Sequence, residues 1–476
     1  MNILVLESST SSAKAMIYSS ENENIIEEQE AFIYEKGHYT LDADQVFHQT
    51  INVGNKLTQK FKGSISLIVL ITTWHSVFLC DNNFRPMTNV YNWNSIVSSE
   101  TYSKLRNDSD FVDKFYENTG CMVSTIYPLF KLIYLKENGY NISDYKIMSQ
   151  GVYNLYNLTG MYKDSASLAS GSGLLNVFNK NYYEYLFDYI NISFNNLPQI
   201  VSVKSTFPIT AEMAKLLGVN TGTPVSMCLP DGASNHIAVA GNEPNIMSFS
   251  VGTSGALRLS IDKPYVSKDN HSTWCYLSPD NWLIGAATSG AGNCSSWYKN
   301  KFFPDKSYAE IESVCASRDD SPVFLPFLYG ERSPGWNDYL MGSFHSIKDE
   351  FDNYDFFTAV LEGILFNLYQ CYLEIIKTSH SNDISKIVLS GGIVHSEFWT
   401  QLCVDIFGRI MDIPVNLQSS LLGGVIFGLT LNGEETEAKK LMKIQRTVKP
   451  NKDKFEYYQT KYQKYLKHYN YLIKNH

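Results

Sequence analysis

The stretch that decides the fold is residues 246–260, which read IMSFSVGTSGALRLS. An apolar run ends at Val251, four small residues follow from Gly252 to Gly255, and a second run continues through Leu257 and Leu259. Two such runs around a glycine-containing turn are typical of a tight hairpin. The pattern predicts two strands joined by a turn that can present backbone N–H groups to an anion.

A similar hairpin is expected at the N-terminus. A strand is predicted from Ile3 to Leu6, a hydroxyl-rich turn over residues 8–12, and a second strand through Met16, Ile17 and Tyr18. When the two turns are aligned, STSSA at residues 9–13 matches GTSGA at residues 252–256. Two similar hairpins about half a chain apart indicate two related domains.

Length and composition agree with two compact domains. The chain has 476 residues, more than one ordinary domain needs, and it is 44% hydrophobic and 18% charged. These values exclude a disordered, collagen-like or coiled-coil protein. The turn-rich segment Gly241 to Pro244 interrupts apolar sequence, so the predicted domains are residues 1–242 and 243–476.

Charge and cysteine usage limit the partners and the location. The 39 Lys and Arg residues against 48 Asp and Glu residues give a net charge of −9, which argues against nucleic acid or an anionic membrane as a partner. The eight cysteines are scattered without a CxxC pair, as expected in a reducing cytoplasm. No basic leader precedes Glu7, and the apolar run from Leu67 to Ile71 is too short to cross a bilayer. We expect a cytoplasmic protein without a membrane anchor.

Two glycine pairs mark further units of strand, turn and helix. Ile387 to Leu389 is predicted as a buried strand, followed by a turn at Gly391 and Gly392 and by a helix that Ser396 caps. A second turn of this kind is predicted at Gly423 and Gly424, after a strand ending at Leu417 and before another apolar helix. Alternating strands and helices predict an α/β protein.

The C-terminal tail from about Thr447 is rich in Lys and Tyr. Aromatic residues recur there at spacings of three and four, which predicts a terminal helix with one apolar face. A basic aromatic helix is compatible with nucleic-acid binding, but such a stripe is more often a helix docked on the protein with its lysines in water. We expect the docked helix.

Three turns in the sequence are candidates for holding phosphate. No GxxxxGK[ST] motif and no GxGxxG after a strand occur, so a Walker-type loop is excluded. The two hairpins and the unit at Gly391 and Gly392 can instead present N–H groups to phosphate oxygens. Each of them alone is more often an ordinary hairpin or a helix cap.

One carboxylate is a candidate general base. Asp231 lies between Pro230 and Gly232, just before the apolar run Ile237 to Ala240. A carboxylate on a turn that leads into a buried element can accept a proton from a hydroxyl nucleophile. An Asp-Gly pair is also a common turn, and the residues alone leave both interpretations open.

Taken in order, these segments resemble the FGGY family of carbohydrate kinases over nearly the whole chain. The stretch around Pro128, Lys131, Leu132 and Leu135 resembles the first signature of the family. The segments that carry the resemblance are TTWHSVFLCDNNFRPMTNVYNW (72–93), TGCMVSTIYPLFKLIYLKEN (119–138), MSQGVYNLYNLTGMYKDSASLASGSGLLN (148–176), LPFLYGERSPGWN (325–337), AVLEGILFNL (359–368), SGGIVHSEFWTQLCVDIFG (390–408) and LLGGVIFGL (421–429).

The resemblance implies both a fold and a reaction. The implied fold is α/β, with two actin-like (ribonuclease H-like) lobes of duplicated topology and an interlobe cleft. The implied reaction is phosphorylation of a sugar hydroxyl that uses ATP and Mg²⁺, with Asp231 as general base and with Glu7 and Asp231 near the metal. A homodimer is also compatible with the resemblance.

The implied site residues fall into two groups. The sugar contacts are Trp74, His75, Trp93, Tyr127 and Asp231, although Trp74 and Trp93 are equally compatible with core packing. The implied ATP contacts are Thr10, Ser11, Ser12, Lys14, Gly252, Thr253, Gly292, Gly391, Gly392 and Ser396.

The substrate is open at this point. The sequence is most similar to the gluconate kinase branch, because Ser76 follows His75 where the xylulose kinase branch usually has Gly. A kinase for xylulose or another ketose is the alternative. A third hypothesis is a family member that binds sugar or nucleotide but has weakened catalysis. It is suggested by five residues that depart from the family pattern, which are Glu7, Ser9, Ser95, Val97 and Leu229.

Overall fold

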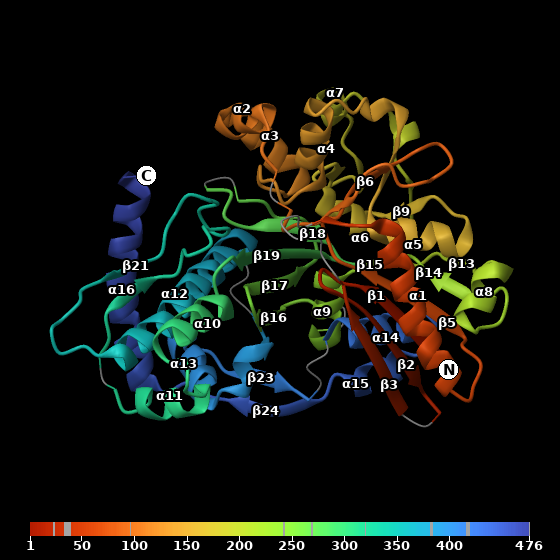
Figure 1. Ribbon diagram of the computed structural model, residues 1–476. Coiled ribbons are helices and arrows are strands. Elements are labelled where there is room, and N and C mark those ends of the chain that lie inside the picture. Colours follow the sequence, from red (N-terminus) through yellow and green to blue (C-terminus); the bar gives the residue numbers. More distant parts are fainter. Residues whose placement is uncertain are drawn as a thin grey trace. The chain divides into compact units, whose positions relative to one another are not determined.

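The computed structural model describes residues 1–21, 24–32, 40–95, 97–240, 243–267, 270–318, 320–380, 384–415 and 419–475. The chain forms two compact units (Figure 1). The first comprises Met1–Asn242, Cys275–Leu283 and Gln418–Met442, and the second comprises Glu243–Trp274, Ile284–Leu417 and Lys443–His476. The predicted domain boundary falls on Gly241 and Asn242, which lie outside the described residues.

The first unit contains both strands and helices. Its strands are β1 (Asn2–Ser8), β2 (Ser12–Ser19), β3 (Asn24–Ala31), β4 (Thr40–Leu41), β5 (Leu67–Thr72), β6 (Phe78–Cys80), β7 (Val90–Tyr91), β8 (Lys146–Met148), β9 (Lys163–Ser165), β10 (Leu175–Asn176), β11 (Asn181–Tyr182), β12 (Gln199–Val201), β13 (Thr206–Pro208), β14 (Pro224–Ser226) and β15 (Leu229–Pro230). Its α-helices are α1 (Ala43–Lys60), α2 (Glu100–Asn107), α3 (Ser109–Thr119), α4 (Pro128–Glu137), α5 (Gln150–Thr159), α6 (Ala166–Ala169), α7 (Phe187–Ile190), α8 (Ala211–Leu217), α9 (Asp231–Ala240), α14 (Ser419–Leu431) and α15 (Glu435–Leu441).

The second unit repeats the combination of a sheet with covering helices. Its strands are β16 (Ile246–Val251), β17 (Gly255–Ile261), β19 (Trp282–Thr288), β20 (Val323–Leu325), β21 (Ser343–His345), β22 (Lys386–Ser390), β23 (Met411–Pro414) and β24 (Ile444–Val448). Its α-helices are α10 (Gly292–Phe302), α11 (Tyr308–Cys315), α12 (Asn353–Ser379), α13 (Glu397–Phe407) and α16 (Lys452–Asn475). Strand β18 (Trp274–Leu277) lies where the chain passes from the second unit into the first.

The predicted N-terminal hairpin is the centre of the first sheet. Strand β1 is antiparallel to β2, with Leu4 opposite Ile17, and parallel to β5. Within the described residues the strand order is β13-β14-β5-β1-β2-β3, with β15 also paired to β5. The predicted strands and the turn between them are confirmed, and both strands extend beyond the predicted apolar cores.

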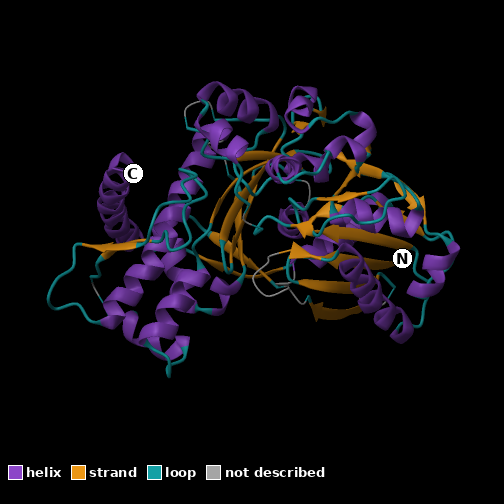
Figure 2. Ribbon diagram, turned by 45° about the horizontal axis from the view of Figure 1, so that its top comes forward, coloured by secondary structure: helices purple, strands orange, loops and turns teal. Residues whose placement is uncertain are grey.

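Helices cover both faces of this sheet (Figure 2). Successive side chains of a strand point to opposite faces, and β1 shows this directly. Leu6 packs against Gly54 of α1, whereas Val5 packs against Gly424 of α14. The strand is therefore buried on both sides, which explains why it reads as a continuous apolar run.

The prediction of a turn at Gly423 and Gly424 is wrong, because both residues lie inside helix α14. The glycines serve close packing instead. A Cβ on Gly423 would lie 1.9 Å from the carbonyl oxygen of Ser234 in α9, and a Cβ on Gly424 would lie 2.8 Å from Ile71 and Val5. Two helices and a sheet approach so closely here that side chains have no room.

In the second unit, the hairpin predicted around residues 246–260 is also confirmed. Strands β16 and β17 are antiparallel, with Phe249 opposite Leu257, and β16 is parallel to β22. The sheet order within this unit is β19-β17-β16-β22-β23-β24. The helix after Gly391 and Gly392 is α13, and Ser396 caps it as predicted, since its Oγ accepts a hydrogen bond from Trp399 N at 2.9 Å.

Helix α12 is the buried core of the second unit. Among the described residues it is the one helix with the length and apolar composition of a membrane span, but 78% of its most apolar segment is buried in the protein. Its Leu368 packs on Gly255 of β17. Burial accounts for the composition of this helix.

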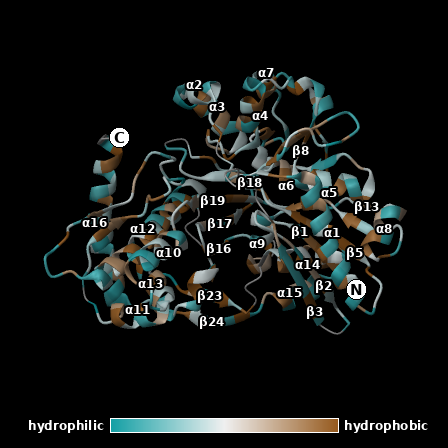
Figure 3. Cartoon of the chain, in the orientation of Figure 1, coloured by the Kyte–Doolittle hydropathy of each residue, from teal (hydrophilic) through white to brown (hydrophobic). Residues whose placement is uncertain are grey.

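The C-terminal helix is docked as expected, but it begins later than predicted. Residues 444–448 form β24, which pairs with β23, and α16 starts at Lys452. Asn451 accepts hydrogen bonds from the backbone N–H groups of Asp453 and Lys454, which caps the helix after Pro450. Hydrophilic and hydrophobic residues alternate along α16 (Figure 3), and Tyr462, Tyr465 and Tyr469 are buried.

A buried carboxyl group faces α16 from the loop after β20. Glu331 is 2% exposed, and a Cβ on Gly335 would lie within 3 Å of both the Glu331 carboxyl and the Tyr469 hydroxyl. Burial raises the pKa of Glu331 to about 8, and the Tyr469 hydroxyl and the Gly335 N–H offset only part of that effect. The folded protein therefore holds this carboxyl protonated near neutral pH.

Replacement of Gly423 by Ala should lower stability. The added Cβ would meet the Ser234 carbonyl, so α9 and α14 must separate, and we expect the free energy of unfolding to fall by about 1–3 kcal/mol in urea titrations. Gly252→Ala is the control, because a Cβ there meets nothing within 4 Å. Equal stability of the two variants would contradict the close contact.

Glu331→Gln should change the pH dependence of stability. Between pH 5 and 8 the unfolded chain releases the proton that folded Glu331 keeps, so this group makes the free energy of unfolding fall as pH rises, by up to about 1.4 kcal/mol per pH unit. The variant should lose that contribution in urea titrations across this range. Glu350→Gln removes an exposed charge as the control, and an unchanged slope in Glu331→Gln would refute the buried proton.

Candidate functional site

The turn of the first hairpin is held by its own hydroxyl groups. Ser9 N and Ser9 Oγ both donate to the Ser12 carbonyl, at 3.0 and 2.8 Å, and Thr10 Oγ1 lies 2.9 Å from Thr73 Oγ1. Ser11 is exposed, whereas Ser12 is buried with its hydroxyl facing Ser9. The turn thus leaves Ser11 exposed and Thr10 half-buried, with Ser12 as an internal support.

Asp231 is the first residue of helix α9, immediately after strand β15. Its Oδ1 accepts hydrogen bonds from Trp74 N at 3.3 Å and from Gly232 N at 2.7 Å. Because β15 and the end of β5 are paired, Pro230 opposite Thr72, the carboxylate lies beside the loop that follows β5. The structure therefore brings Asp231 and the loop of Trp74 and His75 together.

Glu7, at the end of β1, is the second carboxylate of this region. It is 1% exposed; its Oε1 lies 3.4 Å from Lys14 Nζ, and its Oε2 accepts a hydrogen bond from Ser420 Oγ at 2.7 Å. Burial raises the pKa of Glu7, Lys14 and Ser420 oppose that rise, and the negative charge of Asp231 adds to it. The two carboxylates are therefore close enough to repel each other.

This pair fits a magnesium ion held partly by the protein. Mg²⁺ keeps several waters and takes one or two carboxylates plus phosphate oxygens. Within the described part of the chain, no group of three or more His, Cys, Asp or Glu side chains forms a metal cage. Glu7 and Asp231 fit that partial coordination, and a cation beside them would relieve their repulsion.

An aromatic cluster surrounds His75. His75 has a positive φ of 66°, and its Nδ1 lies 2.6 Å from the Gly171 carbonyl. The ring of Tyr276 lies 5.6 Å from His75 and 4.9 Å from Trp74, and the hydroxyls of Tyr276 and Tyr127 are 2.7 Å apart. His75 is thus held in an uncommon backbone conformation by packed rings.

Exposure separates the predicted sugar contacts. Trp74 is 5% exposed with its indole N–H bonded to the Leu168 carbonyl, and Tyr127 is fully buried. Trp93 is 37% exposed, and its Nε1 donates to Thr10 Oγ1 at 3.0 Å. Trp74 and Tyr127 therefore pack beneath the site, whereas His75 and Trp93 remain accessible.

The loop of Trp93 is fixed from below by a buried lysine. Lys131 Nζ donates to the carbonyls of Asn92 and Ile126. Burial lowers the pKa of Lys131 well below its ordinary value. The Lys131 amine therefore holds Asn92, the residue before Trp93, in place. Both of these contacts are to carbonyl oxygens and neither is to a carboxylate.

The second hairpin is tied to the start of helix α10. Gly292 N donates to the Gly252 carbonyl at 2.8 Å, and Asn293 N donates to the Thr253 carbonyl at 3.2 Å. A Cβ on Gly292 would lie 2.5 Å from that Gly252 oxygen, whereas a Cβ on Gly252 would meet nothing within 4 Å. Gly292 therefore permits close packing, and Gly252 borders open space.

The two glycines after β22 also differ in their tasks. Gly391 has a φ of 90°, and a Cβ there would lie 2.5 Å from the Val251 carbonyl. The same added atom on Gly392 would be 3.8 Å from that oxygen. Gly391 makes the turn against β16, and Gly392 leaves room beside it.

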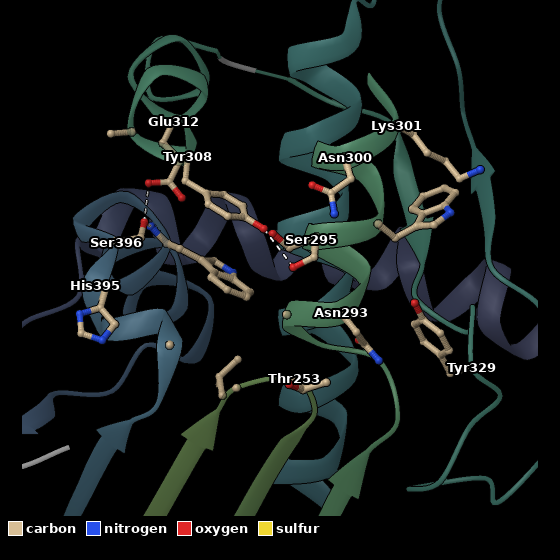
Figure 4. A pocket seen from close by; sticks show the side chains of 18 residues that line it. Thr253, Asn293, Ser295, Asn300, Lys301, Tyr308, Glu312, Tyr329, His395 and Ser396 are labelled. Carbon is tan, nitrogen blue, oxygen red and sulfur yellow. Dashed lines mark hydrogen bonds between the residues drawn. The ribbon is translucent and has the colours of Figure 1, made fainter. Parts of the chain in front are cut away.

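These elements of the second unit line one pocket of about 1030 Å³ (Figure 4). Figure 4 shows Thr253 at one end, His395 and Ser396 on one side and Asn293, Ser295 and Asn300 of α10 on the other. The predicted residues that line it are Gly252, Thr253, Gly292, Gly392 and Ser396. Gly391 is absent from the lining, in agreement with its structural task.

The sequence matches two domain descriptions that together cover most of the chain. Residues 2–238 match the N-terminal domain of the FGGY family of carbohydrate kinases, and residues 247–431 match its C-terminal domain. The chain belongs to the FGGY family of carbohydrate kinases. As members of this family are phosphotransferases with a sugar hydroxyl as acceptor, the predicted enzyme class is confirmed.

Curated relatives of this FGGY kinase include two sugar specificities. It is 26% identical over 453 residues to gluconokinase of Bacillus subtilis (strain 168), covering 91% of this chain and 88% of the relative. It is 24% identical over 451 residues to xylulose kinase of Staphylococcus epidermidis (strain ATCC 12228 / FDA PCI 1200), covering 90% and 88%.

Solved structures confirm the expected fold class. The ligand-bound xylulose kinase from Lactobacillus acidophilus superposes with a TM-score of 0.92, and the gluconate kinase from the same organism with a TM-score of 0.91. Each is 24% identical in sequence, and each alignment covers 99% of this chain and 98% of the other. The FGGY kinase thus has the two-domain, actin-like α/β fold that the resemblance implies.

Two departures from the family pattern, at Ser9 and Ser95, have local structural explanations. Ser9 does not have a positive φ, so a side chain is tolerated there. Ser95 is buried, and its Oγ accepts a hydrogen bond from Asn92 N at 2.9 Å, which stabilises a turn. Val97 is 9% exposed and Leu229 belongs to the short strand β15.

Several residues that complete these sites were not predicted from the sequence. Tyr276 comes from a segment distant in sequence, and Ser420 reaches Glu7 across more than 400 residues. Glu312 and Trp399 line the pocket of the second unit. Trp399 had a signal, since it lies in the segment 390–408 that carries part of the family resemblance.

A double-mutant cycle tests the hydroxyl pair beneath His75. Tyr127→Phe and Tyr276→Phe each remove the hydrogen bond between these two hydroxyls, so each should lower the free energy of unfolding by about 0.5–1.5 kcal/mol. The double variant should cost clearly less than the sum, because both hydroxyls are then gone. Strict additivity in denaturant titrations would show that the two groups do not interact.

Proposed function

We propose that this enzyme transfers the γ-phosphate of ATP to a hydroxyl of a small open-chain sugar acid, with gluconate giving its 6-phosphate as the first choice. The observation that carries the proposal is the placement of Asp231 beside the loop of His75 and near Glu7. A general base, an accessible polar ring and a partial magnesium site then lie in one unit. The gluconokinase relative supports the choice of sugar.

In this mechanism Asp231 accepts the proton of the attacking hydroxyl. Phosphoryl transfer depends mainly on positioning and on charge neutralisation, so the base needs only to lie within reach of the hydroxyl. The hydrogen bond from Trp74 N fixes one carboxylate oxygen and thereby orients the other. His75 and Trp93 are the accessible residues for contacts with the sugar.

The second unit would hold the nucleotide. Gly252 borders open space next to Thr253, and the pocket continues past Gly392 to Ser396. Mg²⁺, when bound by Glu7 and Asp231, would neutralise phosphate charge. Thr10 and Ser11 of the first hairpin, with Lys14, would supply donors to the terminal phosphates.

A ketose such as xylulose is the second candidate substrate. Ser95 and Val97 stand where the resemblance implies an Asp and an Arg, and both are buried, so neither can replace a charged sugar contact. Loss of that charged contact can change which sugar the site binds. The xylulose kinase relative agrees with this alternative. A weakened sugar- or nucleotide-binding protein is the third, because Glu7 also differs from the family residue.

The proposed location and partners follow from the use of ATP, the cysteines and the net charge. We propose a cytoplasmic enzyme, because ATP is available there and because all eight cysteines are buried thiols without disulfides. A sugar and ATP are its expected partners, and nucleic acid is not among them, given the net charge of −9. A homodimer is proposed from the resemblance alone.

Assays with a panel of sugar acceptors decide among the three proposed functions. ADP release with Mg-ATP is measured for gluconate, xylulose, ribulose, fuculose and glycerol at equal concentrations. Gluconate should give the highest kcat/KM. A higher value for xylulose would favour the ketose kinase, and sugar binding in calorimetry without ADP release for any acceptor would favour the weakened binder.

Asp231→Asn should remove catalysis while preserving nucleotide binding. Loss of the base should lower kcat by about 10²–10⁴-fold in the same assay, because the amide cannot accept the proton. Affinity for ADP should stay within about threefold, since the proposed nucleotide pocket is in the other unit. Asp110→Asn, at an exposed position of α3, is the control. Undiminished kcat in Asp231→Asn would exclude this base.

A further inference from the structure

The pocket of the second unit has an end that the phosphate-binding turns do not reach. In Figure 4, Tyr308 and Glu312 of α11 lie at the end opposite Thr253, with Ser396 beside Glu312. Tyr308 is linked across the pocket to α10, since its hydroxyl lies 3.1 Å from Ser296 Oγ. If the phosphates lie at Thr253, this opposite end is where the base of the nucleotide lies.

Glu312 is an unusual residue for such a place. It is only 9% exposed, and its Oε2 accepts a hydrogen bond from Ser396 Oγ at 2.7 Å. No hydrogen bond from another described residue reaches its Oε1. Burial raises the pKa of this carboxyl, and the Ser396 hydroxyl opposes the rise. One oxygen is thus fixed, and the other is left to accept a hydrogen bond from a ligand.

A second group at this pocket also lacks a partner. The indole N–H of Trp399 is buried, the residue is 7% exposed, and no acceptor among the described residues pairs with it. A buried donor without a partner is unfavourable, so an acceptor on a ligand is favoured there. Trp399 lines the same pocket as Glu312, so a ligand there meets one acceptor and one donor.

We propose that Glu312 selects the nucleotide base, favouring adenine over a purine with a carbonyl at the same ring position. The exocyclic amine of adenine donates a hydrogen bond, and its ring nitrogens accept one, which matches the free Glu312 oxygen and the Trp399 N–H. Hypoxanthine presents a carbonyl oxygen where adenine has the amine, and that oxygen repels a carboxylate. This inference rests on the proposed function, because it assumes that the pocket holds a nucleotide.

Guanine is disfavoured by the same geometry. Two neighbouring N–H donors of guanine are best matched by both oxygens of one carboxylate. The Ser396 hydroxyl already occupies Oε2 of Glu312. The remaining oxygen can serve a single amine, which is what adenine offers.

The test measures binding of ADP and IDP by calorimetry, without sugar. Wild-type protein should bind ADP about 10- to 100-fold more tightly than IDP, because a hydrogen bond to a charged group is lost with IDP. Glu312→Gln keeps the size and a partner for Ser396, and its amide can donate to the IDP carbonyl. The ratio should fall below about threefold in this variant.

Two controls make the result specific. Glu310→Gln removes the same charge from the exposed side of α11 and should keep the wild-type ratio. Trp399→Phe should weaken ADP binding by about 2- to 10-fold, through loss of one neutral hydrogen bond. Undiminished ADP binding by Trp399→Phe, or a ratio in Glu312→Gln equal to that of the wild type, would overturn the proposal.

The remaining outcomes separate this inference from the proposed function. Wild-type protein that binds ADP and IDP equally would overturn base selection alone. A penalty for 2′-deoxyADP that Glu312→Gln abolishes would assign the carboxylate to the ribose and would also overturn it. Wild-type protein that binds neither nucleotide would contradict both the inference and the proposed function.

Discussion

The close contact of helices α9 and α14 at Gly423 positions the two carboxylates of the proposed catalytic pair in the first unit. Asp231 opens α9, and Ser420 lies in the first turn of α14. The helices are joined by the hydrogen bond from Ser234 Oγ to the Ser420 carbonyl, and Ser420 Oγ in turn holds Glu7. This close approach, which only a glycine permits, thereby supports both carboxylates of the proposed catalytic pair.

The acidic balance of the chain makes backbone groups important for phosphate binding. With a net charge of −9, the overall field does not attract a triphosphate. In the proposed nucleotide site, Gly252 and Gly392 leave space beside the backbone of their turns. Lys14, a cation of the first hairpin, lies 3.4 Å from Glu7.

The sequence predicted the parts that local patterns encode. Both hairpins, the cap at Ser396 and the docking of the C-terminal helix follow from periodicity and turn chemistry. The error at Gly423 and Gly424 has a clear cause, since a glycine pair marks a turn and a close helix contact with the same letters. Tyr276 was beyond reach because it lies 149 residues from Tyr127, and no local pattern in the sequence connects the two.

The central claim is that Asp231 and Glu7 together support phosphoryl transfer to a sugar, although Glu7, on the metal side, differs from the residue of the family pattern. Phosphorus NMR of the enzyme with Mg-ATP and gluconate tests it most directly, because it follows the phosphoryl group itself. The account predicts that the γ-phosphate signal is replaced by one phosphomonoester signal in equal amount with ADP. Orthophosphate as the product, or intact ATP at high enzyme concentration with every sugar of the panel, would contradict it.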